Sequence, residues 1–160
     1  MRPFKLEEYF VAHEFTAQYL LCCSDAESWS MAEIVAMASE KEPWENLRLG
    51  YTECQGLPRL RHSIAQNLYH GLNADNILVF TGAEEGIFCA LNAMLTPSDH
   101  VIVITPCYQS LSEIPESIGC NITKLELLPK KKWQLDLERL KKAILPSTKA
   151  IVINFPHNPT

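Results

Sequence analysis

Short, wholly apolar runs recur along this chain, and they limit its possible folds more than any other feature. Residues 77–80 (Ile-Leu-Val-Phe), 101–104 (Val-Ile-Val-Ile) and 150–153 (Ala-Ile-Val-Ile) contain no polar side chain. A strand that is apolar on both faces is typical of a parallel sheet covered by helices on both sides. We therefore expect these runs to be buried strands of a layered α/β domain.

Segments with helical signals separate the runs and supply the crossovers that parallel strands need. Ser30 and Glu33 form a capping box, which predicts that a short helix begins after Ser30. The remaining signals predict helices over residues 57–68, 83–95, 110–118 (with Gly119 as C-cap) and 137–144, and a strand over residues 122–127. The predicted apolar face of the first of these four helices consists of Leu57, Leu60, Ile64, Ala65 and Leu68.

Composition and charge exclude several functional classes. The 160 residues are 47% hydrophobic, as in ordinary globular proteins, and the net charge is −5 with no basic stripe. This balance argues against nucleic acid as a partner. The apolar runs are too short to span a bilayer, and the first ten residues lack the apolar core of a secretory signal. We expect a cytoplasmic protein with no membrane partner.

The cysteines and histidines show no metal-binding pattern. None of the cysteines forms a CxxC pair or has a histidine at zinc spacing. We expect no metal site, and free thiols that serve in part as small core residues. The six cysteines are Cys22, Cys23, Cys54, Cys89, Cys107 and Cys120.

Three loops follow predicted strands, where parallel sheets place their ligands. At residues 81–84 (Thr-Gly-Ala-Glu) a strand turns into a helix through Gly82, and the free N–H groups of such a turn attract anions. At residues 105–108, Tyr108 can offer its ring to a flat ligand. Residues 154–160 (Asn-Phe-Pro-His-Asn-Pro-Thr) hold the amide of Asn158 between two prolines.

Each loop also has a purely structural interpretation. Thr81 and Glu84 can form a capping box around Gly82, Tyr108 can be a packing residue, and Asn158 can serve turn formation alone. Neither GxxxxGK[ST] nor GxGxxG occurs after a strand, so a P-loop or dinucleotide site is poorly supported.

Taken together, the loops resemble the class I/II aminotransferases, which are fold type I pyridoxal-phosphate enzymes. Residues 51–64, with Tyr51, Gly56, Leu60-Arg61 and Ile64, are similar to the family's Y-x4-G-x3-LR-x2-I segment. Residues 81–84 resemble its phosphate-binding turn, residues 106–108 its P-x-Y loop, and residues 154–160 its N-x-P-x-N-P-T-G motif. All four segments occur in the family's order.

The resemblance implies a fold, a cofactor and site residues. The fold is the three-layer α/β/α large domain with a mostly parallel sheet, formed in part by residues 46–160, with residues 1–45 as an N-terminal arm and small-domain segment. The cofactor is pyridoxal 5'-phosphate. The resemblance implies that the N–H groups of Gly82, Ala83 and Glu84 bind its phosphate. Tyr108 stacks on the pyridine ring, and Asn158 hydrogen-bonds the phenolic oxygen. Tyr51 reaches the phosphate of the partner subunit in a homodimer.

The chain departs from the family at two places. It ends at Thr160, before the positions where the family carries its cofactor-linked lysine, so the catalytic residue is unknown and the chain is expected to be an N-terminal part, inactive alone. In place of a glycine-containing substrate loop it has Leu-Cys-Cys-Ser-Asp at residues 21–25, where Cys22 or Ser24 can shape the substrate pocket or simply pack.

The resulting hypothesis is a transaminase of amino acid metabolism or biosynthesis, which moves an amino group between an amino acid and a 2-oxo acid. One alternative is another pyridoxal-phosphate reaction on the same scaffold, by a lyase, cyclase or racemase. The other is a naturally short chain without catalytic activity. The cofactor motifs do not distinguish among these reactions, because they bind the cofactor and do not determine which bond at the substrate's α-carbon breaks.

Overall fold

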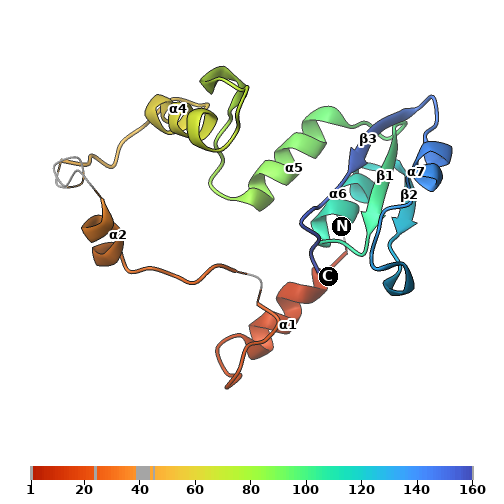
Figure 1. Cartoon of the computed structure of the whole chain (residues 1–160), viewed down its shortest axis with the longest axis horizontal. Helices are drawn as coiled ribbons and strands as arrows, with labels where there is room; N and C mark the ends of the chain where they lie inside the picture. The colour runs from red at the N-terminus through yellow and green to blue at the C-terminus, as the bar shows by residue number, and fades with distance from the viewer. Residues whose placement is uncertain (1, 24, 39–43, 45, 160) are drawn as a thin grey trace. The chain divides into compact units, whose positions relative to one another are not determined.

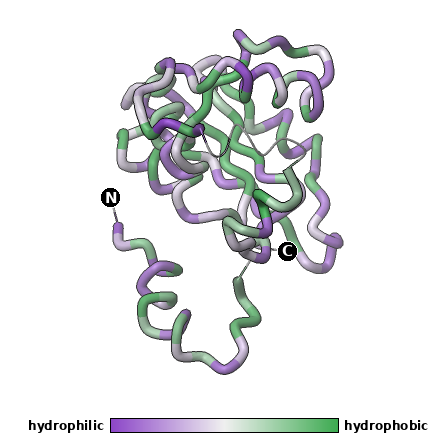
Figure 2. The backbone as a smooth tube through the Cα atoms, turned by 90° about the vertical axis from the view of Figure 1, so that its left-hand side faces the viewer, coloured by the Kyte–Doolittle hydropathy of each residue, from purple (hydrophilic) through white to green (hydrophobic). Residues whose placement is uncertain are grey.

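The computed structural model describes residues 2–23, 25–38, 44 and 46–159. It divides into two compact units (Figure 1), which are described separately. Unit 1 comprises Met1–Tyr9 and Phe80–Thr160, and unit 2 comprises Phe10–Val79. Helix α1 (Lys5–His13) crosses from the first unit into the second. Its turns carry hydrophilic and hydrophobic residues side by side, as the segment near the N-terminus in Figure 2 shows.

Unit 1 is built on a parallel sheet of the strands β1 (His100–Thr105), β2 (Asn121–Glu126) and β3 (Thr148–Val152). The strand order is β2-β1-β3, and both pairings are parallel. The central strand β1 is buried at every residue except its last, as expected for an apolar run inside a parallel sheet. The three predicted strands over residues 101–104, 122–127 and 150–153 are thus confirmed.

Helices cover both faces of this sheet. On one side, Val101 and Val103 pack with Leu91 of α5 (Ala83–Met94) and Ile114 of α6 (Ser110–Ile118). On the other side, Ile102 and Ile104 form a second cluster. Leu125 and Leu127 complete that cluster, and Leu140 and Ala143 of α7 (Leu137–Ala143) pack against it. Successive residues of β1 therefore serve opposite layers, and the predicted three-layer α/β arrangement is confirmed.

Local signals fix the helix ends. Gly119 ends α6 with a left-handed backbone, φ 96°, which a side chain would strain. The Asp136 carboxylate accepts the N–H of Arg139 at the start of α7. The short 3-10 turn η2 (Pro129–Lys131) places its lysines in solvent.

A buried histidine links the three strands. The His100 side chain sits at the start of β1, and the residue is only 3% exposed. Its Nδ1 lies 2.7 Å from Thr148 Oγ1 on β3, and its Nε2 lies 2.8 Å from Thr123 Oγ1 on β2. Both ring nitrogens are therefore paired, as a buried polar group requires.

Unit 2 contains α2 (Met31–Met37), α4 (Pro58–Asn67) and the 3-10 turn η1 (Ala74–Asn76). The predicted capping box is confirmed: Ser30 Oγ accepts the Glu33 N–H, and the Glu33 carboxylate accepts the Ser30 N–H.

The predicted inward face of α4 is wrong in part. Ala65 is buried and Ile64 half-buried, whereas the side chains of Leu57, Leu60 and Leu68 are exposed. The second buried residue of the helix is Arg61, because its guanidinium donates to the carbonyls of Gly56 and Ala74, at 3.1 and 2.8 Å.

The strand predicted over residues 77–80 is not formed. These residues are extended, but they take part in no pairing of the described sheet. A backbone bond runs instead from the Val79 N–H to the Gln55 carbonyl, 3.0 Å away. A strand needs a neighbour as well as an apolar sequence, so hydropathy alone could not establish this one.

The cysteines match the expectation in redox state and only partly in position. All six are free. Cys107 and Cys120 pack against the core, whereas Cys22, Cys23, Cys54 and Cys89 are exposed and are not core residues. Within the described residues, no group of acidic, histidine or cysteine side chains could hold a metal ion. No helix in the same residues is long and apolar enough to cross a membrane.

Candidate functional site

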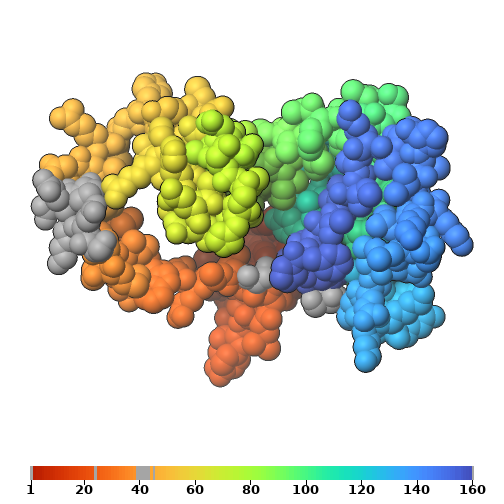
Figure 3. All heavy atoms as spheres, turned by 45° about the horizontal axis from the view of Figure 1, so that its top comes forward, coloured from red at the N-terminus to blue at the C-terminus, as the bar shows by residue number. Residues whose placement is uncertain are grey.

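Two of the three predicted ligand loops meet in unit 1. His157, from the segment after β3, has its Nε2 2.7 Å from the carbonyl oxygen of Pro106, in the loop after β1. The His157 ring also lies 5.6 Å from Phe155 and stacks at 6.5 Å on Trp133, measured between ring centroids. These contacts fix both loops at the carboxyl end of the sheet. The darkest blue atoms of Figure 3, which belong to the last described residues, lie at the surface in that view.

The start of α5 is open. Gly82 is the N-cap residue, and no side chain caps the helix. A Cβ built on Gly82 would meet nothing within 4 Å, so the space beside the turn is free. The backbone there is extended, φ −158°, so the glycine serves access rather than an unusual conformation. Within the described residues, the N–H groups of Gly82, Ala83 and Glu84 have no hydrogen-bond acceptor.

The two glutamates beside this turn are held by other groups. Glu84 Oε2 accepts the hydroxyl of Ser110 at 3.0 Å, and Glu85 Oε2 accepts the N–H of Thr81 at 2.9 Å. The alternative capping box of Thr81 and Glu84 is therefore wrong. Ser110 is buried and begins α6, so its bond to Glu84 also joins the first turn of α5 to the first turn of α6. Both carboxylates keep their negative charge, and that of Glu85 occupies the Thr81 N–H, so an anion at the helix start would use the N–H groups of Gly82, Ala83 and Glu84.

Tyr108 lies in the loop after β1 and is half-buried. Its ring centroid is 5.1 Å from that of Phe4, and the two ring planes are inclined by 53°. An aromatic pair of this geometry is attractive. Asn158, two residues before Thr160, is half-buried in the segment that His157 fixes.

A thiol close to the site is not a nucleophile. Cys107 precedes Tyr108 and packs against the core cluster of α5 and α6. Burial raises the pKa of the Cys107 thiol, so the group stays protonated at neutral pH.

Tyr51 and the residues 21–25 belong to unit 2. Tyr51 is fully exposed and lines an open pocket of about 620 Å³ together with Leu47, Arg48, Gly50, Thr52, Glu53 and Leu57. Cys22 is exposed, and the Cys23 thiol lies 3.2 Å from the Asp25 carboxylate. Ser24 and Thr160 lie outside the described residues.

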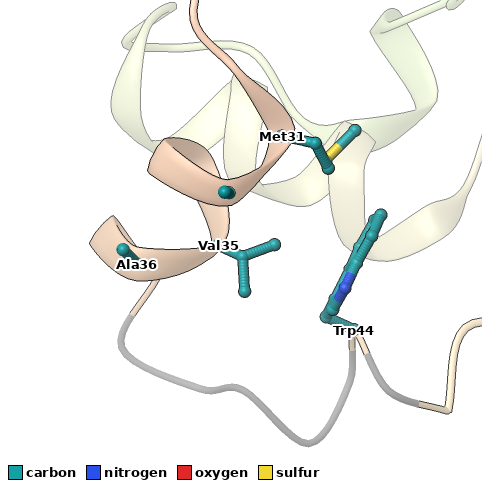
Figure 4. Close-up of a pocket in the computed structure, with 5 residues that line it drawn as sticks. Met31, Val35, Ala36 and Trp44 are labelled. Carbon is teal, nitrogen blue, oxygen red and sulfur yellow. The ribbon is translucent and has the colours of Figure 1, made fainter.

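A second pocket of unit 2 has an apolar lining. It holds about 340 Å³ between α2 and Trp44, and Met31 and Val35 point toward the indole (Figure 4). Its other lining residues, Ala32 and Ala36, are also apolar, so it offers no group for acid, base or anion chemistry.

Sequence reasoning missed His157 and Phe4. His157 stands between the two prolines of residues 154–160, and that position was the one available signal that its side chain is held. Phe4 had no signal, because its contact joins the first residues to a loop about a hundred positions later.

Comparison with known proteins identifies the family. The family model "Aminotransferase class I and II" matches residues 25–160. The chain therefore belongs to the class I and II aminotransferase family.

Individual relatives agree with this assignment. An aspartate/prephenate aminotransferase of Thermus thermophilus is 35% identical over 114 residues, which are 69% of this chain and 30% of that protein. A PLP-dependent aminotransferase of Streptococcus suis superimposes with a TM-score of 0.91 at 32% identity, over 99% of this chain and 44% of the other. The PLP-dependent cyclase OrfR superimposes at 0.86 and 30% identity, over 100% and 42%. The chain spans about 30% of the length of the curated relatives that it matches.

Proposed function

We propose that the full-length protein is a pyridoxal-phosphate-dependent aminotransferase that exchanges an amino group between an amino acid and a 2-oxo acid. The observation that carries the proposal is the start of α5, where the N–H groups of Gly82, Ala83 and Glu84 have no acceptor among the residues that the structure describes, and where the two nearby carboxylates are bonded to Ser110 and Thr81. Such a turn fits a phosphate, because the helix dipole and the amides both favour an anion.

Tyr108 and Asn158 complete the cofactor site in this proposal. Tyr108 offers the face of its ring to the pyridine, and the Asn158 amide donates to the phenolic oxygen. A hydrogen bond to that oxygen favours its ionised form, because the donor stabilises negative charge. Bound pyridoxal phosphate supplies an electron sink for the substrate's α-carbon, and the residues here bind and orient it.

The remaining assignments rest on the family resemblance. Tyr51 reaches the phosphate of the partner subunit in a homodimer, which its full exposure permits. Residues 1–45 form the arm and small-domain segment, and residues 46–160 part of the large domain. The enzyme acts in the cytoplasm, in amino acid metabolism, and its cofactor-linked lysine lies outside these residues.

Another pyridoxal-phosphate reaction is the second candidate. The superposition on the PLP-dependent cyclase OrfR at 30% identity supports this second candidate, because a protein named for a different PLP-dependent reaction has the same fold over this chain. Product analysis separates the two candidates. Transfer of the amino group to an added 2-oxo acid supports the aminotransferase, whereas cyclised or eliminated products without transfer support the alternative.

The site is tested by substitution in the full-length protein. Asn158→Ala and Tyr108→Ala should each weaken pyridoxal phosphate binding by about tenfold, since each removes one contact to a bound ring system. The matched control is Asn92→Ala on the exposed side of α5, where the amide donates only to the Phe88 carbonyl. Affinity for the cofactor is measured by titrating the apoprotein. Unchanged affinity and turnover in both site variants would remove the assigned roles.

A further inference from the structure

The segment before α1 is fastened to the loop after β1 by one side chain. Gln109 Nε2 donates to the carbonyl of Pro3 at 2.9 Å, and Gln109 Oε1 accepts the N–H of Lys5 at 3.1 Å. Phe4 is the one residue between these two points. Its backbone is thus held on both sides while its ring contacts Tyr108.

A third attachment is the ion pairing of Arg2 with Glu113 and Glu116 of α6, which we call the latch. Arg2 Nε donates to Glu113 Oε2 on α6 at 2.9 Å, and Arg2 Nη2 forms an ion pair with Glu113 Oε1 at 2.5 Å. Arg2 also pairs with Glu116, whose other oxygen lies 2.6 Å from Lys124 Nζ. A two-point bond between a guanidinium and a carboxylate is specific in direction as well as favourable in energy.

The latch depends on an ionised and largely buried carboxylate. The Glu113 side chain is 11% exposed, whereas that of Arg2 is 63% exposed. The hydrogen bond from Arg2 lowers the pKa of the Glu113 carboxyl, so that group is charged at neutral pH. A largely buried carboxylate that lost Arg2 would keep only the weaker influence of Lys124, so the ion pair favours the attached position of the first residues.

We propose that Phe4 is a positioning residue for Tyr108, and that Arg2 and Gln109 hold Phe4 in place. The inference rests on the proposed function, in which Tyr108 faces the cofactor ring. By contacting one side of the Tyr108 ring, Phe4 restricts its rotation before the cofactor arrives. A side chain that is already ordered loses less entropy on binding, so the affinity for the cofactor rises.

The test uses the full-length protein and begins with four single variants: Phe4→Ala, Phe4→Tyr, Arg2→Lys and Glu138→Gln. Phe4→Ala should weaken pyridoxal phosphate binding about threefold to tenfold, the range expected for one aromatic pair, and should reduce the visible circular dichroism of bound cofactor. Phe4→Tyr keeps the ring and should restore both values.

The variants Arg2→Lys and Glu138→Gln distinguish the effect of the Arg2–Glu113 ion pair on cofactor binding from the effect of losing any surface ion pair. Arg2→Lys keeps the charge but loses the two-point bond, so its cofactor affinity should fall and should fall further at high salt. Glu138→Gln removes the exposed ion pair of Glu138 with Lys141, 2.8 Å apart on α7. This variant should leave the affinity for the cofactor and its dependence on salt unchanged.

Combining Phe4→Ala with Tyr108→Ala tests whether Phe4 acts through Tyr108. The double variant should bind the cofactor no more weakly than Tyr108→Ala alone. A melting temperature that falls in Phe4→Ala while affinity and circular dichroism stay unchanged would show that Phe4 only packs, and would overturn the inference. In that case the proposed function still stands if Tyr108→Ala weakens binding. A wild-type protein that binds no pyridoxal phosphate would instead contradict the proposed function itself.

Discussion

Two glycines of unit 2 share a left-handed backbone but not the same surroundings. Gly56 has φ +101°, and a Cβ added there would lie 2.6 Å from the Cβ of Val79. Gly71 has φ +90°, and a Cβ there would meet nothing within 4 Å. Since the obstacle at Gly56 is the Val79 Cβ, a change of rotamer cannot relieve it. At this one position, both conformation and space require glycine.

We therefore predict unequal losses of stability for Gly56→Ala and Gly71→Ala. Both variants carry the cost of a side chain in the left-handed region, about 1–2 kcal/mol. Only Gly56→Ala adds a collision with the Val79 side chain, so its free energy of unfolding should fall further. Urea unfolding of the full-length protein measures both values. Equal losses would mean that residues 56 and 79 do not approach as described.

Among the elements, β1 contributes most to the core of unit 1. Val101, Ile102 and Val103 are fully buried, and consecutive residues face opposite helical layers. The Ile102 side chain packs with Ile104, Leu125 and Leu127. Because β1 is the middle strand, a cavity beside it is bounded by β2 or β3 and cannot easily collapse.

Shortening Ile102 should lower stability in steps. Ile102→Val should cost about 0.5–1.5 kcal/mol, and Ile102→Ala about 2–5 kcal/mol, because each removed methyl group leaves a larger cavity. The midpoint of chemical unfolding in the full-length protein checks the series. If Ile102→Ala cost no more than Ile102→Val, the residue could not be in a close-packed layer.

Elements with local signals could be predicted from sequence, and those that depend on a distant partner could not. The bounds of α6 matched because Gly119 marks its end within the segment itself. The strand over residues 77–80 failed because pairing requires a neighbour that hydropathy does not reveal. On α4, periodicity predicted an apolar face but could not indicate that Arg61 finds carbonyl partners and becomes buried.

The candidate site shows the same division. The turn at Gly82, Tyr108 and Asn158 stood out because their residue types and loops are unusual in sequence. The supports of that site were not predictable. The bond of His157 to Pro106 spans 51 residues, and that of Gln109 to Pro3 spans 106 residues. Contacts of this separation arise only from the tertiary arrangement.

Across the whole molecule, many large apolar side chains remain exposed. Leu49 is 98% exposed, Leu21 93% and Phe15 91%. Exposed apolar surface on this scale is typical of interaction surfaces or of surfaces prone to association. The strands β2 and β3 also form the two edges of the described sheet, and open edges can pair with other chains.

The 160-residue chain expressed on its own should therefore bind a hydrophobic dye and self-associate with rising concentration. The full-length protein of the proposal above should bind much less dye, because in that proposal further chain covers part of this surface. Sedimentation velocity and dye fluorescence on the two proteins provide the measurement. A monodisperse 160-residue monomer that binds no dye would contradict the expectation.

The bridge from His100 has a consequence for how the sheet assembles. Thr123 and Thr148 reach the two ring nitrogens only when both outer strands stand at their native positions along β1. Sliding either strand by one residue would turn its threonine to the opposite face and leave an imidazole nitrogen without a partner in a dry interior. The histidine thus favours the native register of both outer strands over a shift of one residue.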